Sequence, residues 1–249
     1  MRRILSLLML LPITGWAADA PREFNALYDF ERGRLSIGET RIGLERSQDD
    51  IYRYWSESKA TGFASIFIDD VIKEESLFRF EDGRLWPVSY EYRQLNSGKN
   101  RAEDIAYDWT DGIATVNYRG HESVVELEPG TMDRFLMQLA ISLHSQDGRL
   151  DRTYRIIDNS RIKTYQLQSR ETETLTTPAG TFETLRVERI DDNKDKKLRL
   201  WLAPELDYLP VKIEQEKLNE EPLRLVLKKI KSEKDTLDSA RSEKGNEQD

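Results

Sequence analysis

The feature that most constrains this chain is an alternation of apolar and polar side chains with a period of two, which runs from about residue 24 to about residue 230. Such alternation is typical of β-strands that have one buried and one solvated face. Two Asp-Gly pairs, at 82–83 and 111–112, each separate two of the alternating runs. Because Asp-Gly accepts the positive φ angles of a tight hairpin turn, each pair predicts two neighbouring antiparallel strands.

The pattern predicts about fifteen strands in one domain, since no stretch rich in Pro and Ser divides the chain between residues 24 and 230. A β-barrel or sandwich of this length folds as one unit. We therefore expect an all-β fold with one amphipathic helix, in which a long antiparallel meander curls into an open barrel or spiral. The expected strands are 26–31, 35–45, 51–58, 76–81, 85–93, 103–109, 113–119, 123–128, 153–158, 162–170, 173–177, 182–190, 197–202, 211–217 and 223–230.

One segment, 131–144, departs from the period of two and predicts the helix. Thr131 is the expected N-cap, Asp133 falls in the first turn, and His144 near the end offers a cation to the negative end of the helix dipole. We expect the apolar face to pack across the mouth or the concave face of the sheet. The residues at helical spacing are Met132, Phe135, Leu136, Leu139, Ala140 and Leu143.

The two ends of the chain differ from the strand pattern. Residues 1–17 combine a basic start, a short apolar stretch and small residues before position 18, which predicts a signal peptide cleaved after Ala17. The apolar stretch is shorter than the roughly 20 residues of a membrane-spanning helix, so no permanent membrane anchor is expected after cleavage. Residues 18–230 then form a single β-rich domain, 231–249 form a charged disordered tail, and the expected location is the periplasm.

Charge and cysteine content exclude several classes of protein. The chain has 46 acidic and 38 basic residues, and Lys and Arg are interspersed with carboxylates. A nucleic-acid partner is therefore not expected, because it would require a basic face. The absence of cysteine excludes disulfides, a thiol nucleophile and Cys-ligated metal sites.

The sequence contains no catalytic or cofactor motif. It lacks a Gly-x-Ser-x-Gly nucleophile elbow, a phosphate-binding Gly-rich loop and a His-Glu-x-x-His helix. The two histidines do not make a metal site, and His121 is expected in an exposed turn. We therefore expect no enzymatic activity, no cofactor and no bound metal.

Two acidic groups deserve a structural interpretation. Asp191, Asn193 and Asp195 match the first positions of a calcium loop, but Lys196 stands where the loop needs glycine, so a charged hairpin loop is the better interpretation. Asp69 and Asp70 are adjacent, so on a strand their side chains would point to opposite faces. A turn is expected there rather than a catalytic pair.

Two stretches carry a family resemblance. The first is Thr177-Pro178-Ala179-Gly180-Thr181-Phe182, and the second is the Pro-containing segment 201–214. Together with Met132-Asp133-Arg134 and Gly38-Glu39, they resemble bacterial secreted proteins grouped as domain of unknown function 3108, over roughly residues 24–230. The resemblance implies a periplasmic β-rich domain and assigns no activity, cofactor or site residue.

Both stretches also have a structural interpretation. Thr177, Pro178 and Gly180 predict a hairpin turn that leads into the strand of Phe182. In the second stretch two prolines, Pro204 and Pro210, are expected to bound an irregular corner between strands, because proline cannot donate a ladder hydrogen bond. Over that corner we expect the rings of Trp201 and Tyr208.

These observations support two function hypotheses of different kinds. The first is a non-catalytic envelope protein that binds a lipid or another apolar ligand in the concavity under the helix. The alternative is a structural or protein-interaction factor in envelope assembly, with a filled core and a protein-binding edge or corner; a hydrolase using scattered carboxylates ranks third. The candidate ligand-binding residues are Met132, Phe135, Leu136, Leu139, Trp201 and Tyr208.

Overall fold

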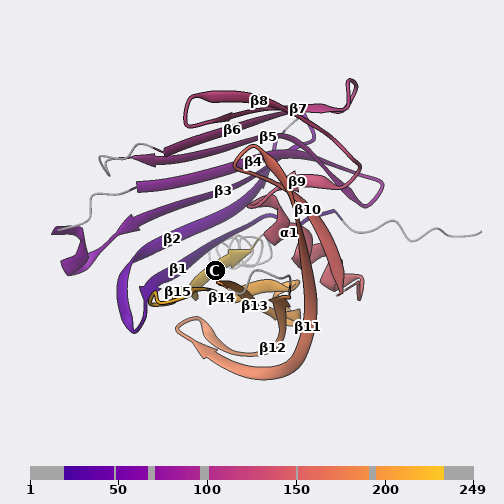
Figure 1. The fold of residues 1–249 in the computed structure, drawn as a ribbon. Helices are drawn as coiled ribbons and strands as arrows, with labels where there is room; N and C mark the ends of the chain where they lie inside the picture. The colour runs from indigo at the N-terminus through magenta and orange to yellow at the C-terminus, as the bar shows by residue number, and fades with distance from the viewer. Residues whose placement is uncertain are drawn as a thin grey trace, which may run out of the picture.

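A computed structural model describes residues 20–47, 49–66, 71–95, 101–149, 151–190 and 195–232. Fifteen strands, one α-helix and two short 3-10 helices lie within these ranges (Figure 1). The helices are α1 (Leu136–Gln146), η1 (Gly62–Ile66) and η2 (Pro204–Leu206). The strands are β1 (Phe24–Arg32), β2 (Leu35–Arg46), β3 (Ile51–Ala60), β4 (Val71–Glu81), β5 (Arg84–Leu95), β6 (Arg101–Asp108), β7 (Ile113–Tyr118), β8 (His121–Glu126), β9 (Thr131–Asp133), β10 (Arg152–Asp158), β11 (Arg161–Thr177), β12 (Gly180–Arg189), β13 (Lys196–Ala203), β14 (Leu209–Lys217) and β15 (Leu223–Ser232).

All fifteen strands belong to one sheet, ordered β8-β7-β6-β5-β4-β3-β2-β1-β15-β14-β13-β12-β11-β10-β9. Strands that are consecutive in sequence are neighbours in the sheet, except β8 and β9, which form its two edges. The pairing of β1 with β15 joins the two halves of the meander. Each pairing is antiparallel apart from β9 with β10, which is parallel. A long antiparallel meander is therefore the observed fold, as the alternation predicts.

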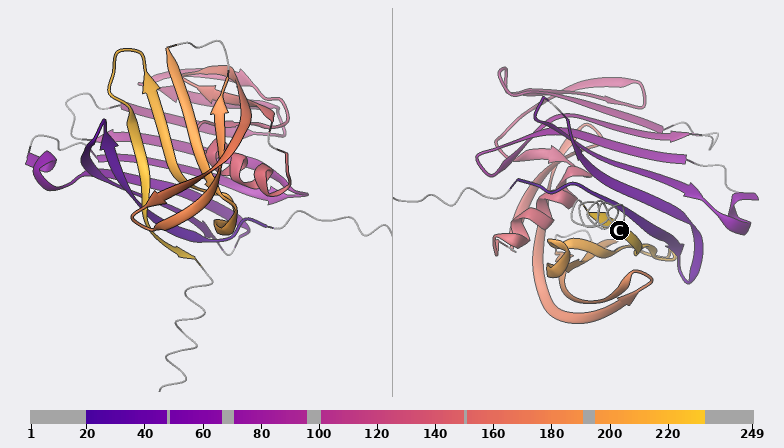
Figure 2. Two further views of the ribbon diagram at one scale, coloured as in Figure 1. Left: turned by 90° about the horizontal axis from the view of Figure 1, so that it is seen from below. Right: turned by 180° about the vertical axis from the view of Figure 1, so that it is seen from behind.

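The sheet curls until one of its edges meets its own buried face. The edge strand β9 contacts β5, and the hydroxyl of Ser76 on β4 donates to Asp133 at the end of β9. Figure 2 shows the result from two sides, with β1–β8 forming a curved wall and β10–β15 rolling beneath it. This closure makes the predicted open barrel or spiral, and α1 lies inside the curl.

The two Asp-Gly turns differ in their detail. Asp82 and Gly83 both take positive φ, as a two-residue hairpin between β4 and β5 requires. At the second pair, β6 already ends at Asp108, which lies opposite Ile113, so the connection is a four-residue loop. The carboxylate of Asp108 accepts two backbone amides inside this loop, and that local hydrogen bonding ends the strand early.

The long strand β11 joins two strands that the sequence predicts separately, 162–170 and 173–177. An irregularity in its pairing with β12 lies between Ser169 and Thr172, where the alternation is interrupted. At its far end Thr177 pairs with Gly180 around a two-residue turn that leads into the strand of Phe182, as predicted. Phe182 is buried. The turn also donates from the amide of Ala179 to the carbonyl of Leu227 on β15.

The start of the helix is where the sequence prediction was wrong. Thr131 and Met132 belong to β9, and α1 begins at Leu136. The carboxylate of Asp133, not the hydroxyl of Thr131, accepts the first free amides, from Phe135 at 3.0 Å and Leu136 at 2.7 Å. Pairing of β9 with β10 holds residues 131–133 extended, so the helix can start only after them.

The corner between β13 and β14 matches its prediction in part. Pro204 opens η2 at the end of β13, as expected. Pro210, however, lies within β14 opposite Leu202, next to an irregularity in the ladder. Its carbonyl accepts the hydroxyl of Tyr28 at 2.9 Å, which ties the corner to β1.

The predicted ends of the domain lie at the limit of the described residues. Strand β15 runs to Ser232 and pairs with Phe24 at the start of β1, so the sheet continues two residues past the expected domain end at 230. The predicted signal peptide, 1–17, and the rest of the predicted tail, 233–249, lie outside the described residues. In the part of the chain that the structure describes, no helix is long and apolar enough to cross a bilayer.

Candidate functional site

The most unusual group of side chains lies at the seam where β9 and the start of α1 meet the buried face of β4–β6. We call it the seam cluster, and it joins segments that are 31 to 60 residues apart in the sequence. Its charged members come from β4, from β6, from the end of β9 with the residue that follows it, and from the end of β10. The cluster consists of Glu74, Ser76, Tyr90, Tyr92, Glu103, Tyr107, Asp133, Arg134 and Asp158.

Asp133 is the fully buried carboxylate of the cluster. Its side chain has no exposed surface. One oxygen, Oδ1, accepts the hydroxyl of Ser76 at 2.8 Å and the two backbone amides that begin α1. The other oxygen, Oδ2, has no hydrogen-bond partner among the residues that the structure describes. Burial raises the pKa of Asp133 to about 6, although the hydrogen bonds to Oδ1 oppose the rise.

Arg134, the next residue, faces three carboxylates and two aromatic rings. Its guanidinium lies 2.9 Å from Glu103, 3.2 Å from Glu74 and 3.7 Å from Asp158. The same group lies over the rings of Tyr90 and Tyr92, at 5.5 and 4.9 Å from their centroids. A planar cation with several donors suits such a site, because it can serve carboxylates and stack on aromatic faces together.

The charged groups of the cluster shift the pKa values of one another. Burial alone would lower the pKa of Arg134, but Tyr90 and the three carboxylates outweigh burial and raise it. Burial raises the pKa of Glu103, which is 1% exposed, while Arg134 and the amide of Asn159 oppose the rise. Arg134 therefore stays cationic and holds the carboxylates in place.

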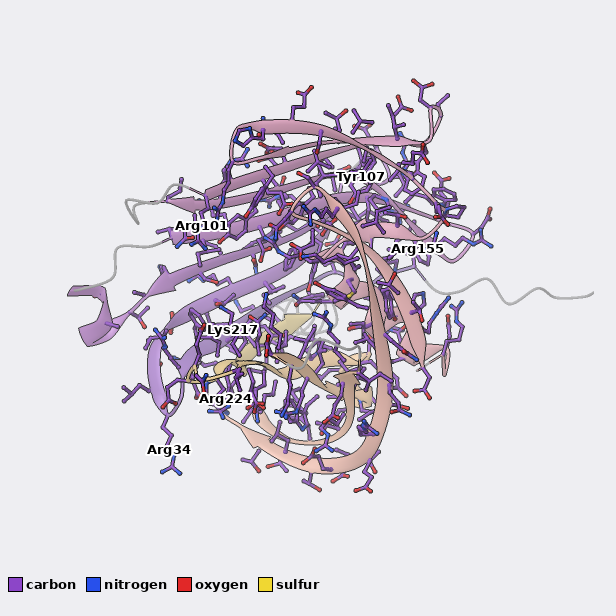
Figure 3. All side chains as sticks on the ribbon, viewed as in Figure 1. Arg34, Arg101, Tyr107, Arg155, Lys217 and Arg224 are labelled. Atoms are coloured by element: carbon purple, nitrogen blue, oxygen red, sulfur yellow. The ribbon has the colours of Figure 1, made fainter. Side chains whose placement is uncertain are left out.

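Tyr107, on β6, completes the buried side of the cluster, and Figure 3 shows it in the upper part of the molecule. Burial raises the pKa of its phenol, and Asp133 and Glu103 raise it further, so the hydroxyl stays protonated. That hydroxyl has no hydrogen-bond partner within the described residues, and neither has the hydroxyl of Thr131. Each unpaired buried polar atom of this kind lowers the folding stability that the seam contributes.

The seam cluster is arranged to hold two parts of the sheet together rather than to act on a substrate. Asp133 and Glu103 have essentially no surface that a substrate could touch, and each is engaged by groups from another strand. Opening the seam would separate Arg134 from partners on β4 and β6 and free the first turn of α1. The cluster thus holds the edge of the spiral onto its wall.

The predicted ligand-binding residues of the helix region are packed in the core. Met132, Phe135, Leu136 and Leu139 are between 0 and 6% exposed. The ring of Phe135 stacks on that of Tyr54 with centroids 4.2 Å apart. Phe135 thus packs against one of the chain's own aromatic residues.

The other two predicted ligand-binding residues lie near the β13–β14 corner. Trp201 is buried, donates from its indole to Glu173 at 2.8 Å and lies 4.0 Å below the ammonium of Lys212. Tyr208 is half-buried and takes a positive φ after Asp207. Tyr208 lies at the corner, between η2 and β14. Trp201 is held by Glu173 and Lys212 as well as by packing.

A small pocket lies at the far end of α1, lined by Phe80, Leu85, Leu143 and His144 among others. Its volume is about 30 Å³, which is room for one or two water molecules and far too little for an acyl chain. His144 donates to or accepts from Tyr154 at 2.9 Å. Burial, helped by Arg152 and Arg149, lowers the pKa of His144 to about 4, so it is neutral and not the cation that the sequence predicted.

The two edges of the described sheet differ in accessibility. Every residue of β9 is buried, because that edge is the seam. In β8, by contrast, Glu122 and Glu126 are exposed and Val124 is 62% exposed. Local alternation cannot reveal this edge, since only the strand order shows that β8 has, within the described part of the chain, a neighbour on one side alone.

Two of the acidic motifs lie at or beyond the limits of the structure. Asp69-Asp70 and the first two positions of the calcium-like motif, Asp191 and Asn193, lie outside the described residues. Within the described ranges, no three side chains of His, Asp or Glu are arranged to hold a metal ion. His121, predicted in a turn, is exposed at the start of β8.

Comparison with known proteins defines the class of this fold. The spiral is similar to the crystal structure of a β-barrel-like protein of domain of unknown function 1849 from Brucella abortus, with a TM-score of 0.51, 11% identity, and coverage of 85% of this chain and 98% of that one. A proposed lipoprotein from Parabacteroides distasonis is similar at a TM-score of 0.33 and 10% identity, over 85% and 96% of the two chains. The protein is thus a β-barrel-like domain.

The family follows from the sequence itself. The model of the protein family of unknown function DUF3108 matches residues 24–227, and the chain belongs to that family. The match confirms the resemblance carried by the 177–182 and 201–214 stretches. No curated protein matches the chain significantly.

Proposed function

We propose that this protein is a non-catalytic factor of the bacterial envelope, acting in the periplasm by binding another protein. The observation that carries the proposal is a contrast within one sheet: the side chains under α1 are buried, while the edge strand β8 has β7 as its one neighbour among the described residues. A carrier of apolar molecules needs the reverse, a hollow interior.

The packing under α1 supports this choice over the apolar-ligand hypothesis. Leu136 has no exposed surface, and Phe135 and Tyr54 occupy the space between helix and sheet with stacked rings. The pocket at the end of α1 holds water-sized molecules only. Ligand binding at Met132, Phe135, Leu136 and Leu139 stays an untested prediction.

The seam cluster supports a role without catalysis. Its carboxylates are tied to Arg134, Ser76 and backbone amides, and both Asp133 and Glu103 are shielded from solvent. A general acid or base must reach its substrate within hydrogen-bond distance. The placement in the periplasm rests on the basic and apolar start of the sequence, residues 1–17.

Native mass spectrometry of the mature protein, purified from its own periplasm, tests the proposal. We expect a mass with no bound lipid, no apolar molecule in a solvent extract, and no uptake of a fluorescent fatty acid into the interior. The Leu35→Ser variant is the matched control, because Leu35 is 72% exposed and reports adsorption to the surface. A lipid held at a fixed ratio and released only on denaturation would contradict the proposal.

A further inference from the structure

The edge strand β8 has the geometry of a docking site for another strand. Its six residues pair with β7 in an unbroken register, with no bulge to turn the edge away. Most natural edges are protected by a bulge, a proline, a lysine or a covering segment. β8 contains neither proline nor lysine.

The backbone groups that face outward can be assigned. The amide of Leu127, just after β8, donates to the carbonyl of Gly112 on the β7 side. In an antiparallel strand successive residues alternate between the two sides, so the odd-numbered residues of β8 bond to β7. The amides and carbonyls of Glu122, Val124 and Glu126 therefore face the free edge.

The side chains of these same three residues are all exposed, with an apolar residue between two carboxylates. A strand added at this edge would place its alternate side chains opposite them, at the short cross-strand separations where unlike charges attract. The complementary strand carries a basic, then an apolar, then a basic residue at alternate positions.

The charge pattern also disfavours a second copy of this chain as the occupant. The antiparallel register that sets Val124 opposite its own copy sets Glu122 opposite Glu126, twice. Like charges directly opposite one another are destabilising. The edge thus resists pairing with itself.

We propose that β8 binds an extended segment of a partner protein by strand addition, and that this segment has basic side chains at two alternate positions flanking an apolar one. This inference rests on the proposed protein-binding function and names the surface and the chemistry of the partner. Backbone hydrogen bonds to Val124 supply affinity, and the two glutamates select the sequence.

The test uses the peptide acetyl-Thr-Lys-Thr-Val-Thr-Lys-Thr-amide, which reads the same in both directions and so fits a parallel or an antiparallel approach. We expect its addition to the full mature protein to change amide NMR signals at residues 121–126 and their neighbours on β7, and to leave β9 unchanged. Changes centred elsewhere, or none at millimolar peptide, would overturn the inference.

Two pairs of variants make the test specific. Val124→Pro removes an outward amide without touching the β7 ladder and should abolish binding, whereas Val124→Thr keeps the amide and should retain it. The double variant E122K/E126K should weaken binding at least tenfold and gain affinity for the peptide with Glu in place of Lys. Binding that ignores both changes would sink the inference, as would a dimer formed through β8.

The outcome is independent of the lipid-extraction experiment. A failed peptide titration with an interior free of lipid would remove β8 as the docking surface and leave the proposed function standing. A bound lipid would remove the proposed function whatever the peptide does.

Discussion

The hydroxyl of Ser76 and the carboxylate of Asp133 are joined by a 2.8 Å hydrogen bond across 57 residues of sequence. That bond links β4 in the curved wall to the edge strand β9. The same carboxylate oxygen caps α1, so closing the spiral and starting the helix depend on one group. Burying this carboxylate disfavours its charged form, and the raised pKa of Asp133 reflects that cost.

Replacement of Asp133 by Asn should change how stability depends on pH. The folded pKa of about 6 lies above the ordinary value of 3.8, so the stability that Asp133 contributes is fully present below pH 3.8 and is lost as the pH rises through 6. The free energy of unfolding of D133N should improve relative to wild type by on the order of 3 kcal/mol between pH 4 and pH 7. Urea titrations at both pH values check this, and a constant difference would contradict it.

The contribution of His144 to stability should depend on pH in the opposite direction to that of Asp133. Its folded pKa of about 4 lies below the ordinary 6.5, so its contribution is present above pH 6.5 and is lost as the pH falls through 4. The His144→Gln variant should therefore gain stability relative to wild type on acidification, by on the order of 3 kcal/mol at pH 4. Parallel urea titrations of this variant and D133N separate two effects that offset each other in the wild type. The same trend in both variants would refute the assignment.

Removal of Arg134 should be costly. The Arg134→Met variant leaves the buried Glu103 without its cation, which typically costs about 3–5 kcal/mol. The double variant R134M/E103Q should recover part of that loss. As a control, Arg53→Met breaks the 2.6 Å pair with Glu75, whose partners are 45 and 34% exposed, and should cost under about 1 kcal/mol. Equal losses in the two single variants would mean that the seam is not special.

A carboxylate placed under the helix distinguishes a filled interior from a hollow one. In a filled core Leu136→Glu should unfold the domain, because an unpaired buried carboxylate costs several kcal/mol. Leu35→Glu, at an exposed position, should leave the thermal midpoint nearly unchanged. Circular dichroism melts give the answer, and a folded L136E protein would favour a cavity able to admit water.

Sequence alone predicted most of the strands because each is encoded by local alternation and bounded by local turn residues such as Asp82-Gly83 and Pro178. It missed β9, since three residues are too few to show a period and Met132 fits the helical spacing as well. The cap at Asp133 was also missed, because Thr131 is an equally good cap in isolation and only the pairing with β10 decides between them.

The seam cluster could not be predicted from the sequence, because its members come together only when the sheet curls. Glu74, Glu103 and Asp158 look like ordinary solvated carboxylates on alternating strands, and only the curl of the sheet carries them to Arg134. The open edge at β8 likewise depends on which strand lies beside which. Local patterns specify elements, whereas the seam and the edge arise from how the ends of the sheet meet.

The measurement that tests the account most directly is photo-crosslinking in living cells with benzoylphenylalanine at position 124. We predict one discrete protein adduct, lost when Glu122 and Glu126 are changed to Lys and absent when the probe replaces the exposed Leu35. No adduct from position 124, together with lipid adducts from a probe at position 136, would contradict the account and return the interior to the role of a ligand site.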